Sequence, residues 1–105
     1  MDKRLERISS VLDSHKAEAI EVFDLRGKDY FVDYVVLASS LGQRHTEALL
    51  EHLKKDLKKE EKFLYIDESS DWIVADLGDI LIHIMTPEFR IKYDMESFLS
   101  ELKRA

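Results

Sequence analysis

Residues 71–93, DWIVADLGDILIHIMTPEFRIKY, constrain the fold most, because two strand patterns, a turn and a helix start follow one another within them. The runs on either side of Leu77-Gly78 alternate and are rich in β-branched residues, which predicts an antiparallel hairpin with a tight two-residue turn. Counted outward from that turn, the predicted pairs are Asp76 with Asp79, Val74 with Leu81, and Trp72 with His83.

In this register the hairpin has two different faces, because successive side chains of a strand point to opposite sides. One face is wholly apolar and is expected in the core: Ile73, Ala75, Ile80, Ile82 and Ile84. The other face mixes apolar side chains with acids, the only tryptophan and a histidine: Trp72, Val74, Asp76, Asp79, Leu81, His83 and Met85. This second face is either covered by a helix or is a contact surface.

The segments before the hairpin follow from hydrophobic periodicity. Residues 2–15 are spaced as an amphipathic helix, and residues 19–25 and 30–39 read as strands. The short connection through Gly27 favours an antiparallel pair. Asp33 interrupts the second strand, so either pairing starts near Tyr34 or the carboxylate faces outward. The spacing of a capping box in residues 40–43 predicts the start of the next helix, and residues 63–66 a short third strand.

Two helices are predicted after the hairpin. Thr86 is expected to cap the first, with Pro87 at its first position. Asp94 is expected to cap the last helix, whose inward side chains are Met95, Phe98, Leu99 and Leu102. The resulting order, α-β-β-α-β-β-β-α-α, predicts an α/β protein of the mixed α+β kind, with helices flanking a mixed five-stranded sheet in a single domain over residues 1–105.

The charge of the chain is unevenly placed. Residues 63–89 contain six acidic residues and no lysine or arginine, and the rest of the chain has sixteen of each sign, so the whole net charge of −6 belongs to this segment. A phosphate backbone requires the opposite sign, whereas a basic protein is the natural complement. The alternative is that the acidic segment serves only solubility.

Composition excludes several classes of chemistry. The chain has no cysteine, so disulfides and thiolate nucleophiles are excluded. The charged N-terminus and the lack of a long apolar run predict a cytoplasmic protein with no membrane contact. The histidines show no zinc-binding spacing, and no serine-centred elbow or phosphate-binding glycine loop occurs. We therefore predict no catalytic residue, cofactor or metal.

Two readings of the hairpin's mixed face remain. In one, Trp72 is the apolar anchor of a docking face that also includes Asp76, Asp79 and His83, with Tyr34 and Arg90 adjoining. In the rival reading, Asp76, Asp79 and His83 surround a metal in a nucleotide-binding or phosphoryl-transfer enzyme. His83 opposite Trp72 is also compatible with a simple packed cross-strand pair.

Residues 71–98 resemble the signature of the ribosomal silencing factor (Iojap-like) family. The matching positions are Trp72, Asp76, Gly78, Asp79, His83, Glu88, Arg90, Tyr93 and Glu96. Upstream, residues 33–39 resemble the family's D-[YF]-hydrophobic-I-A-S segment, and residues 43–45 match its helix start approximately. The chain departs from the family at residues 40–42, at Phe98-Leu99 and in the loop before Trp72. The role of residues 40–45 is therefore left open.

The resemblance implies a non-enzymatic factor that binds the large ribosomal subunit at its fourteenth ribosomal protein, with little direct nucleic-acid contact. Occupying that face blocks joining of the small subunit and lowers translation when nutrients are short. The implied fold is nucleotidyltransferase-like, without the carboxylates of an active transferase. Docking requires a monomer on the ribosome, and a homodimer that hides the same face when free is left open.

Overall fold

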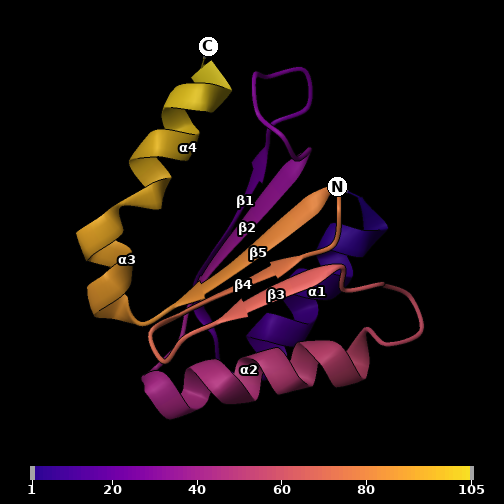
Figure 1. Ribbon diagram of the computed structural model, residues 1–105, viewed down its shortest axis with the longest axis vertical. Helices are drawn as coiled ribbons and strands as arrows, with labels where there is room; N and C mark the ends of the chain where they lie inside the picture. The colour runs from indigo at the N-terminus through magenta and orange to yellow at the C-terminus, as the bar shows by residue number, and fades with distance from the viewer. Residues whose placement is uncertain (1, 105) are drawn as a thin grey trace.

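The computed structural model describes residues 2–104, which form nine elements in the predicted order. These are α1 (Lys3–Ser14), β1 (Glu18–Asp24), β2 (Tyr34–Ser39), α2 (Gln43–Asp56), β3 (Tyr65–Glu68), β4 (Trp72–Asp76), β5 (Ile80–Met85), α3 (Pro87–Tyr93) and α4 (Met95–Arg104). The strands form one sheet in the order β1-β2-β5-β4-β3 (Figure 1). Only β2 and β5 are parallel, so the predicted mixed five-stranded sheet is confirmed.

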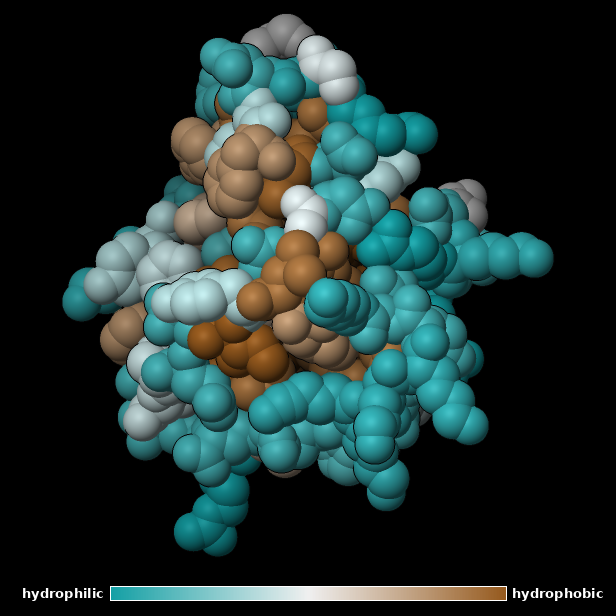
Figure 2. Space-filling model, turned by 45° about the vertical axis from the view of Figure 1, so that its right-hand side comes forward, coloured by the Kyte–Doolittle hydropathy of each residue, from teal (hydrophilic) through white to brown (hydrophobic). Residues whose placement is uncertain are grey.

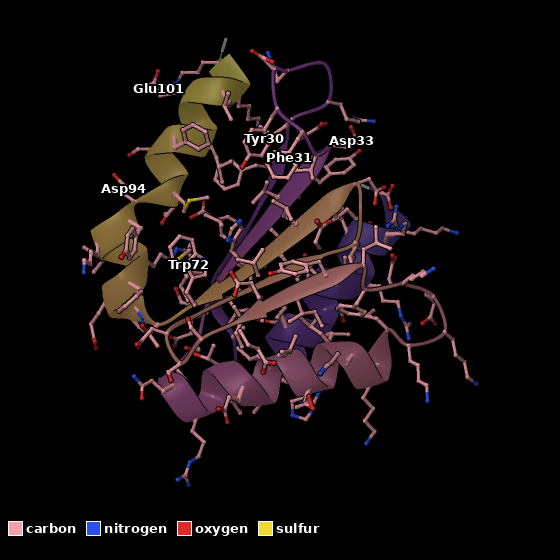
Figure 3. All side chains as sticks on the ribbon, viewed as in Figure 1. Tyr30, Phe31, Asp33, Trp72, Asp94 and Glu101 are labelled. Carbon is pink, nitrogen blue, oxygen red and sulfur yellow. The ribbon has the colours of Figure 1, made fainter. Side chains whose placement is uncertain are left out.

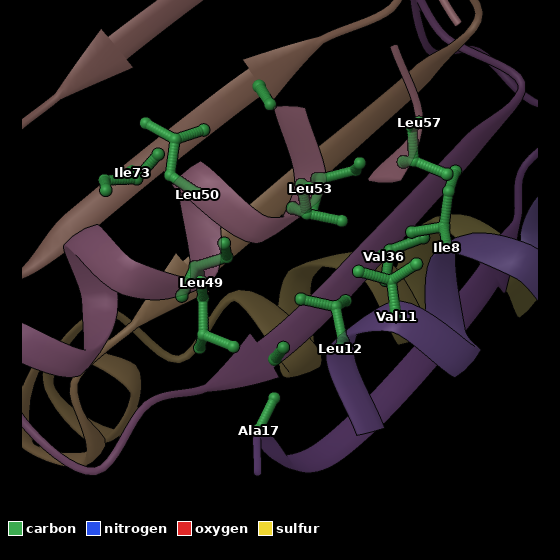
Figure 4. Packing of buried hydrophobic residues seen from close by; sticks show 14 of the residues in the cluster. Ile8, Val11, Leu12, Ala17, Val36, Leu49, Leu50, Leu53, Leu57 and Ile73 are labelled. Atoms are coloured by element: carbon green, nitrogen blue, oxygen red, sulfur yellow. The ribbon is translucent and has the colours of Figure 1, made fainter. Parts of the chain in front are cut away.

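The larger core lies between the sheet and the helices α1 and α2 (Figure 4). Both helices are amphipathic, and the leucines of each pack on the apolar face of the hairpin. The five hairpin side chains predicted for this core are at most 1% exposed: Ile73, Ala75, Ile80, Ile82 and Ile84. This part of the prediction is confirmed, because an uninterrupted apolar face has no other stable place.

The opposite face of the sheet carries a second, smaller core under α3 and α4. Leu81, His83 and Met85 are buried there, and Leu99 of α4 is fully buried against them. The cover is incomplete toward the sheet edge, because Trp72 and Val74 of β4 stay half-exposed. The two alternatives for the mixed face therefore hold for different strands: β5 is covered, and β4 is partly open.

The register of the hairpin differs from the prediction by two residues. Trp72 pairs with Met85 and Val74 with His83, so the central turn residues are Gly78 and Asp79. This places Gly78 at a φ of +99°, which suits glycine, and buries Leu77 instead of exposing it in the turn. The faces of the paired strand residues stay as predicted, because a shift by an even number of residues returns each side chain to the same side. Asp79 is the exception: it was predicted on the mixed face, but it lies in the turn and binds Arg4 of α1.

Three smaller predictions were wrong: the start of β3, the capping box before α2 and the burial of Phe98. β3 begins at Tyr65, two residues later than expected. For β2 the late-pairing alternative is the correct one, because the strand begins at Tyr34 and Asp33 is exposed before it. No capping box forms: Gly42 is the N-cap of α2, and the Ser40 hydroxyl instead contacts Gly42 and Thr46. Thr86 is the N-cap residue of α3 and Pro87 opens the helix, as predicted, although the Thr86 hydroxyl donates to Asp71 and not to the helix. Phe98 of α4 is 50% exposed, because its inward neighbour Leu99 fills the core.

Candidate functional site

Trp72 is held in one orientation at the edge of the second core. Its indole Nε1 donates a hydrogen bond to Nδ1 of His83 at 2.9 Å. The ring of Tyr93 from α3 lies 5.0 Å away, centre to centre, on the helix side, and Tyr93 in turn contacts Phe89. Trp72 accordingly lies between the sheet and α3 (Figure 3). The polar end of the indole is satisfied internally, so a partner would meet an aromatic surface.

His83 is buried, with 6% of its surface exposed. Burial lowers its pKa to about 4, so the ring is neutral at neutral pH. Because Nδ1 accepts the bond from Trp72, we assign the ring proton to Nε2, and that atom has no hydrogen-bond partner within residues 2–104. His83 thus positions Trp72 from inside, which is the packed-pair alternative of the sequence analysis.

The two hairpin acids point to different parts of the molecule. Asp76 shares the face of Trp72, is half-exposed, and accepts a 2.7 Å hydrogen bond from the backbone N–H of Gly78. Asp79 lies in the turn, where both its oxygens accept from Arg4 of α1, at 2.6 and 3.0 Å. Arg4 also binds Glu61, and the pKa of Asp79 is lowered by Arg4. Of these two acids, only Asp76 therefore adds its charge to the face of Trp72.

Tyr34 and Arg90 are not beside Trp72. Tyr34 packs with the larger core on the other face of the sheet, with the Arg26 guanidinium 5.2 Å above its ring. Arg90 is 6% exposed and its guanidinium donates four hydrogen bonds inside the protein. The acceptors are the carbonyl of Ala19 and the side chains of Ser39, Glu21 and Glu96. Arg90 is thus a link between β1, β2, α3 and α4.

The structure adds residues to the face that the sequence did not single out. Tyr65 and Asp67 of β3 pair with Asp76 and Val74, so they project on the same side as Trp72. Both are exposed. The alternation of side chains along β3 places Tyr65 and Asp67 on one side of the strand. The sequence could have indicated which side only if the start of β3 and its pairing with β4 had been known. Figure 2 shows apolar side chains gathered across the middle of one face of the molecule, bordered by hydrophilic ones.

No metal-binding group is formed at this face. Within residues 2–104, no cluster of three or more histidines, aspartates or glutamates could hold an ion. Asp79 is bound to Arg4 and His83 is buried behind Trp72, so the rival metal reading has no support. In the same described range, no helix is long and apolar enough to span a bilayer.

The fold and the site together define the class: a small α+β protein whose internally held tryptophan lies on an acidic face of a mixed sheet. The family model described as "Ribosomal silencing factor during starvation" matches residues 1–105. The chain therefore belongs to the ribosomal silencing factor family, as the sequence resemblance predicted.

Curated relatives agree with the family match. The ribosomal silencing factor of Zymomonas mobilis is 33% identical over 95 residues, which cover 88% of this chain and 71% of that protein. That of Haemophilus influenzae is 32% identical over 95 residues, covering 88% of this chain and 93% of that protein. A mouse protein named "Mitochondrial assembly of ribosomal large subunit protein 1" is 29% identical over 98 residues, covering 88% of this chain and 43% of its own length.

Solved structures share the fold. A crystal structure of a Chromobacterium violaceum protein superposes with a TM-score of 0.86 at 23% identity, covering 95% of this chain and 88% of that one. A Bacillus halodurans protein gives a TM-score of 0.80 at 20% identity, covering 91% and 92% of the two chains.

Proposed function

We propose that this protein represses translation by binding the large ribosomal subunit at its fourteenth ribosomal protein and sterically blocking the small subunit under nutrient limitation. The observation that carries the proposal is Trp72, which His83 and Tyr93 hold in place on the sheet. Trp72 lies within residues 63–89, which contain six acidic residues and no lysine or arginine. Relatives named ribosomal silencing factors, at 33% and 32% identity, support it.

The chemistry of the face favours a basic protein surface over bare RNA. Carboxylates beside an apolar anchor repel phosphates and attract lysine or arginine. The anchor is pre-ordered, because its N–H is already bonded and one side of its ring is packed. The protein acts by occupying a surface, with no catalytic step, and docking uses the monomer in the cytoplasm.

The direct test is sucrose-gradient sedimentation of mixed ribosomal subunits with and without the protein. We expect fewer joined ribosomes when it is present, and its own sedimentation with the large subunit. Trp72→Ala should weaken that binding by about tenfold or more, as for a central interface anchor. Phe31→Ala is the matched control, because Phe31 is another exposed aromatic residue, 70% exposed, and lies in the β1–β2 connection outside the acidic segment. Equal yields of joined ribosomes with and without the protein would refute the proposal.

A further inference from the structure

A hollow of about 240 Å³ lies beside Trp72 at the β3 edge of the sheet, lined by Asp67, Ser69, Trp72 and Val74. Asp67 and Val74 are cross-strand partners, so they form its floor from adjacent strands. The Ser69 hydroxyl donates to the carbonyl of Trp72 at 2.8 Å, which leaves its oxygen lone pairs available. The indole N–H is already bonded to His83, which does not line the hollow, so Trp72 has no donor left for a ligand bound there.

The walls of the hollow have the chemistry of a cation receptor. An indole carries negative potential on its ring face, and a carboxylate beside it adds a full charge. Asp67 is exposed, and its side chain has no ion pair or hydrogen bond with any residue in 2–104. No lysine or arginine occurs between residues 63 and 89 to compete for it.

The neighbouring aromatic rings already accept a cation from within the chain. The ammonium of Lys92 lies 5.6 Å from the ring centre of Phe89 and 5.4 Å from that of Tyr93. Tyr93 contacts Trp72 directly, so the same aromatic cluster meets an internal cation on its helix side. On the β3 side, no counterpart of Lys92 is present among the described residues.

We propose that this hollow receives an arginine side chain of the partner protein, with the guanidinium stacked on the Trp72 indole and bonded to the Asp67 carboxylate. The inference rests on the proposed function for the identity of the partner. Arginine fits better than lysine, because its planar guanidinium stacks on an aromatic face and forms two parallel bonds to one carboxylate. A phosphate group is disfavoured by the same carboxylate.

The first test compares two neighbouring acids of β3 in co-sedimentation with large ribosomal subunits. Asp67→Asn removes the charge in the hollow, whereas Glu68→Gln is the matched control on the opposite side of the strand. We expect Asp67→Asn to weaken binding by about fivefold to tenfold and to reduce its salt dependence. Glu68→Gln should leave both unchanged. Equal effects of the two substitutions, or none from Asp67→Asn, would overturn the inference.

The second test needs no ribosome. Nα-acetylated arginine amide is titrated to about 0.3 M at constant ionic strength, the range expected for one cation–π contact, and Nα-acetylated citrulline amide, which carries no charge, is the control. The fluorescence and indole N–H resonance of Trp72, the only tryptophan, report occupancy. We expect a response to arginine amide alone, lost in Asp67→Asn. An equal response to citrulline amide, or an unchanged response in Asp67→Asn, would contradict the inference.

The two tests separate the two proposals. If the wild type binds large subunits and Asp67→Asn binds equally well, the proposed function stands and the arginine site fails. If the wild type does not bind large subunits, the proposed function fails, and the arginine amide titration alone decides about the hollow.

Discussion

The indole N–H of Trp72 is bonded to Nδ1 of His83 although the two residues are not directly opposite each other in the hairpin. Trp72 pairs with Met85, and His83 with Val74, so the bond runs diagonally across one face. A diagonal pair of this kind is within reach of long aromatic side chains. It links the half-exposed anchor of the proposed docking face to a buried residue of the second core.

A double-mutant cycle should measure this bond. His83→Leu removes the acceptor at similar volume and leaves the indole N–H unsatisfied, which should cost about 1–3 kcal/mol of unfolding free energy. Trp72→Phe removes the donor, and the coupling between the two changes should be about 1 kcal/mol by urea denaturation. Additive effects would show that the bond does not contribute to stability.

The burial of His83 also predicts a pH dependence. The unfolded chain binds a proton on this histidine near its ordinary pKa of 6.5, whereas the folded ring does so only at about 4. The unfolded state therefore holds more protons between these values, and stability falls as the pH falls from about 6.5 toward about 4. The loss is at most on the order of 3 kcal/mol.

Urea midpoints of the wild type and of His83→Leu, compared between about pH 7 and about pH 4, isolate the histidine. The difference between the two proteins should shrink on acidification, because the variant lacks the group that titrates. A constant difference over this range would contradict the assignment. The lowered pKa of Asp79 acts in the same direction but at more acidic pH, below the ordinary carboxyl value of 3.8.

The two hairpin acids should separate binding from stability. Asp76→Asn keeps an oxygen that can accept from Gly78, so we expect stability within about 0.5 kcal/mol of the wild type and several-fold weaker binding to large subunits. Asp79→Asn breaks the ion pair with Arg4 and should cost up to about 1 kcal/mol of stability with little effect on binding. Thermal melts measure the stability of each variant, and co-sedimentation measures its binding. If Asp79→Asn weakened binding and Asp76→Asn did not, the docking face would include Asp79 and not Asp76.

Arg90 should behave as a structural residue. Arg90→Gln leaves the carboxylates of Glu21 and Glu96 close together without their shared cation, and the loss should be about 3 kcal/mol or more. Burial and the nearby Glu96 already raise the pKa of Glu21, so that carboxyl is sensitive to the change. The control is Arg26→Gln, because the Arg26–Asp24 pair is well exposed and its loss should leave stability nearly unchanged. If Arg90→Gln were as stable as the wild type but no longer bound large subunits, Arg90 would have a direct docking role after all.

Much of the fold was predictable because it depends on local periodicity. The alternation of residues 72–85 determined which side chains share a face, and the spacing of leucines in α1 and α2 determined which sides of these helices are buried. The register was missed because the burial of Leu77 and the contact of Gly78 with Leu64, which lies 3.1 Å from where a β-carbon would be, both involve packing outside the hairpin.

The candidate site was predictable only in part. Trp72, His83 and Asp76 share a face as expected, and their docking role stays a prediction. Tyr34 faces the other core, although its segment, residues 33–39, also resembles the family. Its side of the sheet is set by the pairing of β2 with β5, where Tyr34 lies opposite Ile80 of the larger core. That pairing joins segments far apart in the sequence, so no local pattern gave it.

By itself, the sequence determined the order of the elements, the two faces of the hairpin and the family, since each depends on residues close together along the chain. The tertiary structure decided what the charged and polar groups do. Arg4 reaches Asp79 across 75 positions, and Arg90 reaches Ala19 across 71. Such pairings depend on how whole elements pack, so no local pattern indicates which acid is neutralised and which remains free to meet a partner.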